Sequence, residues 1–273
     1  SSGRTKIRHQ PDNLVALRSL PMEIRRQIPP QEFHGRLFTG PQLDQAKKKI
    51  HELCRGRAIV DATEHFVLAS QSGHKPAELV GMGQRLEEVY AFFLRAYRMP
   101  GSKFRIAVYL VPPPNGLQSL AMSLHGLVVS PLSIGYSWEP DMSMVAIVRS
   151  TAIGTLRHEL FHLMVRNDFG DIPVWLDEGL ASLYEEAESR SGEFIGVPGW
   201  RSDVLRDLYP LQPTIEQLVT MSGFQFNGGI ADYDAERQAA IHAKAKCFLL
   251  YLQQKGFLIP VYEGFHSRQM GSD

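Results

Sequence analysis

The sequence has no surplus of either charge, no long apolar run and almost no cysteine. Lys and Arg together number 29, as do Asp and Glu, so the formal net charge is zero. Without a net charge, electrostatics favours neither a nucleic-acid partner nor an anionic membrane. No apolar stretch reaches the roughly 18 residues that a transmembrane helix needs, so no transmembrane segment is expected.

The two cysteines, Cys54 and Cys247, are too few for a disulfide framework. They can form one bridge in an oxidising compartment or remain buried thiols. Both lie in helical, apolar patterns, which favours buried thiols. The first residues, starting at Ser1, carry no apolar signal segment and give no firm indication of targeting.

The chain has the length and the apolar content for a sizeable core. Its 273 residues, 44% apolar and 21% charged, are typical of a soluble globular protein. Residues 1–56 are expected to form an N-terminal extension, because 1–42 are rich in Pro, Arg and Gln and weakly periodic. Residues 57–273 are expected to form one domain of the α+β class.

Hydrophobic periodicity predicts the main elements of this domain. Helical spacing predicts long helices over Pro76–Met99 and Ala235–Lys255. The expected strands are His65–Ser70, Phe104–Val111, Gly126–Ser130 and Ser143–Val148, with a turn-rich stretch over Pro131–Met142. Other helices are expected from Ser150 or Thr151 to about Asn167, from Pro173 to about Ser189, and, as short pieces, within Pro213–Met221 and Phe257–Ser267.

The pentapeptide His158-Glu159-Leu160-Phe161-His162 is the most informative motif. On a helix, residues four apart share a face, so the two imidazoles can hold one metal ion together. Glu159 is then placed to act as a base on a metal-bound water. Taken alone, the two histidines also fit solvated or hydrogen-bonded surface side chains.

A third ligand is available on the next predicted helix. Glu178 follows His162 by 16 residues, within Trp175-Leu176-Asp177-Glu178-Gly179-Leu180-Ala181. Three protein ligands are what a catalytic zinc site needs, because the fourth position stays open. Asp177 competes as the ligand, but neighbours on a helix point about 100° apart, so only one can face the histidines. Asp177 can instead orient a ligand imidazole or interact with the helix dipole.

The two motifs together resemble those of the gluzincin metallopeptidases, and most nearly the small peptidase-MA-like proteins. The resemblance spans roughly His65–Phe265. It implies a zincin-like fold, in which a small mixed sheet lays an edge strand over an active-site helix and a helical C-terminal part follows. It implies one zinc ion held by His158, His162 and Glu178, with Glu159 as general base and an extended peptide or protein as substrate.

The chain also departs from that family. Only 15 residues separate His162 from Glu178, fewer than in thermolysin-like enzymes, which fits a minimal gluzincin. Two residues are candidates for stabilising the oxyanion, His242 and Tyr233. The resembling proteins often have a Tyr at the position of His242. No Gly-Ala-Met-Glu-Asn segment is present, so nothing favours exopeptidase over endopeptidase action. The compartment stays open, and the resemblance alone favours an extracytoplasmic one.

The expected function is zinc-dependent peptide-bond hydrolysis, with Glu159 activating the water. The strand preceding the active helix, taken as Met144–Val148, is expected to pair with the substrate. The alternative is a latent or weakly active, zinc-bearing peptide-binding module whose cleft is filled by residues 1–42 or 257–273. A nucleic-acid partner is not expected, because the basic residues of 1–57 are interspersed and lack a stacking pattern. The oligomeric state is open.

Overall fold

A small mixed sheet forms one half of the structure, a computed structural model that describes residues 47–48, 50–52, 54, 56–102, 105–131, 133–148, 152–169, 171–227 and 234–270. Its five strands are β1 (Ile59–Ala62), β2 (Phe66–Ser70), β3 (Ile106–Val111), β4 (Gly135–Trp138) and β5 (Ser143–Ile147). They lie in the order β1-β2-β3-β5-β4. The inner strands β2, β3 and β5 are parallel, and β1 and β4 run antiparallel to them at the two edges.

Helices cover both faces of the sheet, so its inner strands are apolar on both sides. In β3, Ile106, Val108 and Leu110 belong to one core cluster, and the alternate residues belong to another. The first cluster is formed with α4 (Pro76–Tyr97) and α6 (Gly154–Phe169), and the second with α5 (Gly116–His125). This two-sided burial explains why β3 reads as a continuous apolar run.

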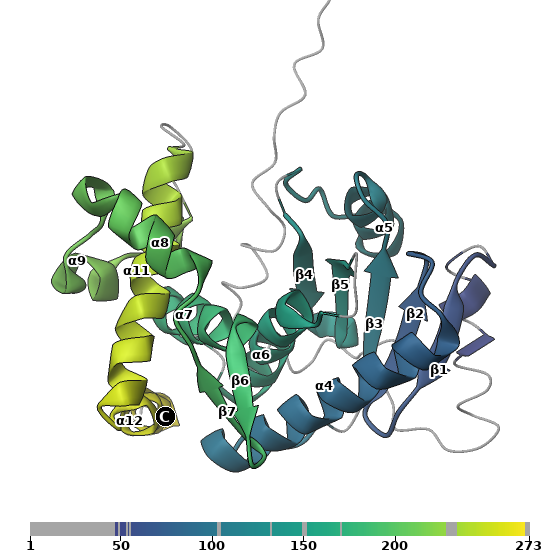
Figure 1. Ribbon diagram of the computed structural model, residues 1–273, viewed down its shortest axis with the longest axis horizontal. Helices are drawn as coiled ribbons and strands as arrows, with labels where there is room; N and C mark the ends of the chain where they lie inside the picture. Colours follow the sequence, from purple (N-terminus) through teal and green to yellow (C-terminus); the bar gives the residue numbers. More distant parts are fainter. Residues whose placement is uncertain are drawn as a thin grey trace, which may run out of the picture.

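The other half is mainly helical and is built onto α7 (Val174–Glu185). α7 packs between α6 and α11 (Ala235–Gln254), which places it between the sheet half and the C-terminal helices (Figure 1). The remaining elements are the hairpin β6 (Ala187–Arg190) and β7 (Glu193–Gly196), α8 (Trp200–Asp207), α9 (Ile215–Thr220), α10 (Gly223–Phe226), α12 (Leu258–Met270) and the 3-10 turns η1 (Glu139–Asp141) and η2 (Tyr209–Leu211). The whole is a mixed α and β architecture, as expected for the α+β class.

The expected strand Gly126–Ser130 is wrong. These residues are not in a strand, and the preceding ten form α5, which was not expected. Leu117, Leu120 and Ala121 are buried at helical spacing, so the periodic signal was present but short. Gly126 has a left-handed φ of 66° and its N–H caps the helix, so it ends α5 instead of starting a strand.

The strand available for pairing also differs from the expectation. Met144–Val148 was expected to pair with a substrate, but β5 lies between β3 and β4 and both of its sides are occupied. β4 is the edge strand, and it comes from Pro131–Met142, which was expected to form turns. With only four residues, β4 lacks a periodic signal of its own, and its pairing with β5 defines it.

Two helices that follow α6 end differently from the prediction. α7 ends at Glu185 instead of about Ser189, because the chain turns there into the hairpin β6–β7. The C-terminal segment forms α12, which packs on α4 and α11 and lies away from β4 (Figure 1). Its described residues therefore belong to the core and do not fill a cleft beside β4.

Several N-terminal expectations fall outside the described residues. These are the arm 1–42, most of the 1–56 extension, and Ser150 and Thr151 as helix caps. Ile50 and Cys54, from the end of the proposed extension, are buried in the core cluster behind the sheet. Cys54 and Cys247 are both free thiols; Cys54 is buried as expected, which raises its pKa to about 11, but Cys247 is only half-buried. Among the described residues, no helix combines the length and apolarity needed to cross a membrane.

Candidate metal centre

Three side chains converge where α6 meets α7. His158 and His162 lie one turn apart on α6, and their Nε2 atoms are 3.1 Å from each other. Glu178 enters from α7, with carboxylate oxygens 3.7 Å from Nε2 of each imidazole. Among the described residues these three form the one group of His, Cys, Asp or Glu side chains close enough to hold a metal ion.

The spacing of these donor atoms fits a tetrahedral zinc site. Ligand atoms about 2.0–2.2 Å from zinc at tetrahedral angles lie about 3.3–3.6 Å apart. The two Nε2 atoms are 3.1 Å apart, each lies 3.7 Å from a different oxygen of Glu178, and one donor atom from each of the three residues lies within 4.8 Å of the others. Two imidazoles and one carboxylate also match the ligand chemistry of three-ligand zinc sites. The residues present therefore fit a zinc ion.

Asp177 contacts a histidine and is not one of the three side chains that could hold a metal ion. Its Oδ1 accepts a hydrogen bond from Nδ1 of His162 at 2.6 Å. With the proton on Nδ1, the lone pair of Nε2 faces the point where the three donors meet. Asp177 thus orients a histidine, which was one of the three roles weighed for it.

The environment of His158 keeps its imidazole neutral. Burial lowers the pKa of His158, and the nearby carboxylate of Glu178 only partly opposes this effect. Its Nδ1 lies 3.8 Å from Oε2 of Glu185, which in turn pairs with Arg201 at 2.7 Å. A neutral imidazole is the form that ligates a metal, so the protonation state suits the site.

Glu159 lies beneath the edge strand, where β4 comes close to α6. The residue is 7% exposed. A Cβ built on Gly135 of β4 would stand 3.1 Å from Oε1 of Glu159 and 2.7 Å from the methyl group of Thr155. The absence of a side chain at Gly135 is what allows the strand to lie directly over the helix and the glutamate.

The two residues proposed for oxyanion stabilisation have different outcomes. His242, on α11, faces the site: its Nδ1 is 3.9 Å from Oε2 of Glu178 and its ring packs edge-on against Phe226. Burial lowers the pKa of His242 to about 4, so the imidazole is neutral at pH 7. Tyr233 lies outside the described residues, and its role stays a prediction.

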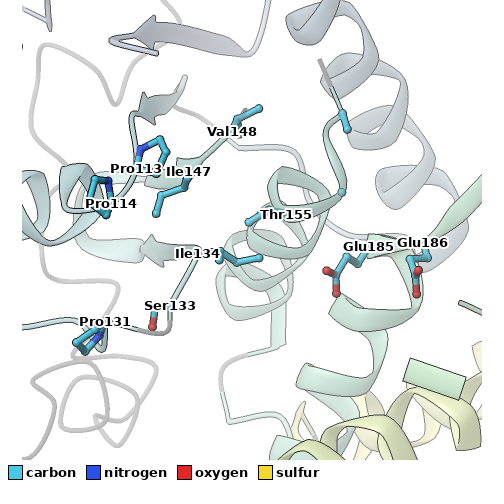
Figure 2. Close-up of a pocket in the computed structure, with 12 residues that line it drawn as sticks. Pro113, Pro114, Pro131, Ser133, Ile134, Ile147, Val148, Thr155, Glu185 and Glu186 are labelled. Carbon is cyan, nitrogen blue, oxygen red and sulfur yellow. The ribbon is translucent and has the colours of Figure 1, made fainter. Parts of the chain in front are cut away.

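A cavity of about 620 Å³ adjoins the N-terminal end of α6. Its outer wall is apolar, with Ile134, Ile147 and several prolines, and Glu185 and Glu186 stand opposite (Figure 2). The cavity adjoins the candidate metal centre, because Glu185 also approaches His158, and Thr155 lies about one turn before His158 on α6. Arg201 pairs with Glu185 and Lys246 with Glu186, so the two carboxylates are charge-compensated.

Searches of protein-family models and of curated proteins find no match to this chain.

Sequence reasoning did not single out Arg166, Gly135 or Glu185, all of which lie at or beside the centre. Arg166 had a sequence signal, since it follows His162 by four residues on the same helix. Gly135 and Glu185 had none, because their roles come from contacts between elements that are separate in the sequence.

Replacing Gly135 with Ala is expected to destabilise the fold by about 1–3 kcal/mol, the usual cost of overpacking. The added methyl meets Thr155 at 2.7 Å and a β5 carbonyl at 3.3 Å, so strand and helix must separate. Urea denaturation measures the change. Gly81→Ala, where the closest group is the end of the Arg85 side chain at 3.6 Å, is the control and is expected to be neutral or stabilising. Equal stabilities for Gly135→Ala and the parent would contradict the close approach of β4.

Proposed function

We propose that this protein is a zinc-dependent peptidase with a zincin-like fold. The observation that supports the proposal most directly is the meeting of His158, His162 and Glu178 around one point, with Glu159 beside it under β4, which pairs with β5 alone among the strands of the described residues. Metal ligands alone would fit many proteins. A buried base and an unpaired strand edge next to them are what peptide hydrolysis needs.

Each residue has a distinct task in this proposal. His158, His162 and Glu178 would hold the zinc ion, which when bound supplies a Lewis acid and an activated water. Glu159 takes a proton from the attacking water and delivers it to the leaving amine. His242, neutral and facing Glu178, has one N–H with which to stabilise the oxyanion. Its distance from Glu178 places it at the rim of the same centre.

The substrate would lie along the free edge of β4. Ile147 donates a backbone hydrogen bond to Ile134 at 2.8 Å, which makes these two a hydrogen-bonded pair of the antiparallel ladder. The alternation of such a ladder turns the backbone groups of Gly135 and Ser137 away from β5 and toward the free edge. An extended peptide can add there as a further strand, directly above Glu159.

The direction of β4 indicates on which side of the cleaved bond the substrate would reach the cavity. β4 starts at Gly135, above Thr155 and Glu159, and runs toward Ser137, whose Oγ is 3.5 Å from Nη1 of Arg166. A peptide that pairs antiparallel to β4 therefore runs toward Ile134 and the cavity. We infer that the cavity receives a side chain from the C-terminal side of the cleaved bond. Its apolar wall and its compensated carboxylates favour a large apolar side chain.

Changing Ile134 to Lys is expected to reduce kcat/KM for substrates with an apolar residue after the cleaved bond by about 10-fold or more. Burying an Ile-sized apolar contact contributes about 1.5–3 kcal/mol, and a cation placed there opposes an apolar side chain. Ile134 is 54% exposed, so the fold should tolerate the change. Val128→Lys is the matched control, because Val128 is 68% exposed but does not line the cavity. Equal losses in both variants, or none in either, would contradict the subsite.

Digestion of a mixed peptide library by the full-length protein tests the function itself. The protein is assayed after dialysis against a chelator and again after one equivalent of zinc is restored. Cleavage that disappears and returns with zinc supports a peptidase. A protein that binds zinc and peptides without cleaving them would favour the latent or weakly active binding module instead.

A further inference from the structure

Arg166 joins the candidate metal centre to the end of the edge strand. Its Nη2 donates to Oδ2 of Asp177 at 3.0 Å, and its Nη1 donates to Oε1 of Glu139 at 2.8 Å. Glu139 is the residue that directly follows β4, and Asp177 is the residue bonded to His162. The guanidinium therefore contacts Asp177, which is bonded to a proposed ligand, and Glu139, which directly follows the strand that would hold the substrate.

We propose that Arg166 is a positioning residue that acts through Asp177 on His162 and so sets the metal affinity of the site. The inference rests on the proposed metal site. Arg166 does not contact the three donor atoms. It fixes the carboxylate that fixes the imidazole.

The geometry of the three side chains supports this chain of contacts. His162 and Arg166 are four residues apart on α6, so they project from the same face. Asp177 reaches across from α7 and uses one oxygen for each of them, at 2.6 Å to His162 and 3.0 Å to Arg166. With both oxygens engaged, the carboxylate is held in one plane, and the hydrogen bond to His162 fixes the rotation of that ring.

Burying the guanidinium of Arg166 without specific partners would cost free energy. The side chains of Arg166, His162 and Asp177 are 3%, 3% and 9% exposed. A buried guanidinium must keep its partners, because an unpaired charge in this environment is strongly destabilising. Arg also offers two separate N–H edges in a rigid plane, which a Lys ammonium does not. The position therefore requires the shape of the guanidinium as well as its charge.

The experiment measures the zinc dissociation constant of the full-length protein by competition with a chelating dye. The variants are Arg166→Met, Arg166→Lys, Asp177→Asn and the double variant Arg166→Met with Asp177→Asn. Loss of an outer partner of a metal ligand typically weakens metal binding by about 10–100-fold. Arg166→Met and Asp177→Asn are each expected to show a loss of that order, and Arg166→Lys a smaller one.

The double variant separates positioning from general destabilisation. If Arg166 acts through Asp177, removing both should weaken zinc binding no more than Asp177→Asn alone, within about 2-fold. Arg105→Met is the control for losing a buried Arg, because Arg105 is 7% exposed and donates to the carbonyl of Glu64, which lies in the connection between β1 and β2. It should bind zinc like the parent. Circular dichroism confirms that each variant is folded before titration.

The outcomes distinguish this inference from the proposed function. Parental zinc affinity in both Arg166→Met and Arg166→Lys, or additive losses in the double variant, would overturn the inference. Should Arg166→Met fail to fold, Arg166→Lys and Asp177→Asn decide the question, and equal zinc affinity in these two and the parent overturns it. A parent that binds zinc but cleaves no peptide leaves the role of Arg166 standing and removes the peptidase. A parent that does not bind zinc removes both.

Discussion

Glu159→Gln is expected to lower kcat/KM by on the order of 10²–10⁴-fold, the contribution of a positioned general base, while zinc stays bound. The amide has nearly the shape of the carboxylate but cannot take a proton from water. Glu159 is outside the group of three donors and lies under Gly135, so the metal site keeps its ligands. Steady-state cleavage of a peptide found in the library digest measures the loss, and metal analysis of the same sample measures zinc.

Glu193→Gln is the matched control for this substitution. Glu193 lies on β7, pairs with Arg95 and is 54% exposed, so its variant should retain parental activity. Cleavage at the parental rate by Glu159→Gln would show that another group is the base. Loss of zinc together with activity would show that Glu159 supports the metal and not the proton transfer.

The second large effect is expected in Glu178→Ala, which should weaken zinc binding. This change removes one of three proposed ligands and is expected to weaken zinc binding by more than the roughly 10–100-fold that follows loss of an outer partner. The two remaining imidazoles, with Nε2 atoms 3.1 Å apart, can still form a weak two-ligand site. Hydrolysis at micromolar zinc should fall with occupancy and recover in part when zinc is raised.

Chelator competition measures this affinity directly, and Glu193→Ala is the corresponding surface control. Glu178→Ala is compared with the Arg166 variants at a chelator concentration that removes zinc from those variants. Full zinc occupancy in Glu178→Ala there would mean that another group is the third ligand, with Asp177 as the first candidate. The hydrogen bond of Asp177 to His162 argues for the opposite result, because that carboxylate is already engaged by two side chains.

The active helix shows why part of this site can be predicted from sequence. His158 and His162 are neighbours on α6 through helical periodicity alone, a local property that needs no knowledge of the fold. Glu178 follows after a short connection, so few paths could bring α7 anywhere except against α6. The long helices α4 and α11 and the inner strand β3 were also predictable, because each carries a strong apolar repeat over its whole length.

The surroundings of the centre could not be predicted in this way. β4 has four residues, and its place at the edge depends on its pairing with β5. The cavity combines side chains from the β3–α5 connection, β5, α6 and the end of α7. No local sequence pattern predicts that these segments lie together. The contact between Glu139 and Arg166 likewise joins residues 27 apart in the sequence.

The sequence by itself determined that His158, His162 and Glu159 are neighbours on one helix, since helical spacing places these side chains before any tertiary contact forms, and the packing of α7 on α6 then brings Glu178 to them. Only the tertiary structure decided which strand lies at the edge of the sheet, which side chain orients His162 and where the cavity for a substrate side chain is formed. The physical reason is that periodicity acts over a few residues, whereas edges, cavities and buried ion pairs exist only between elements that pack together.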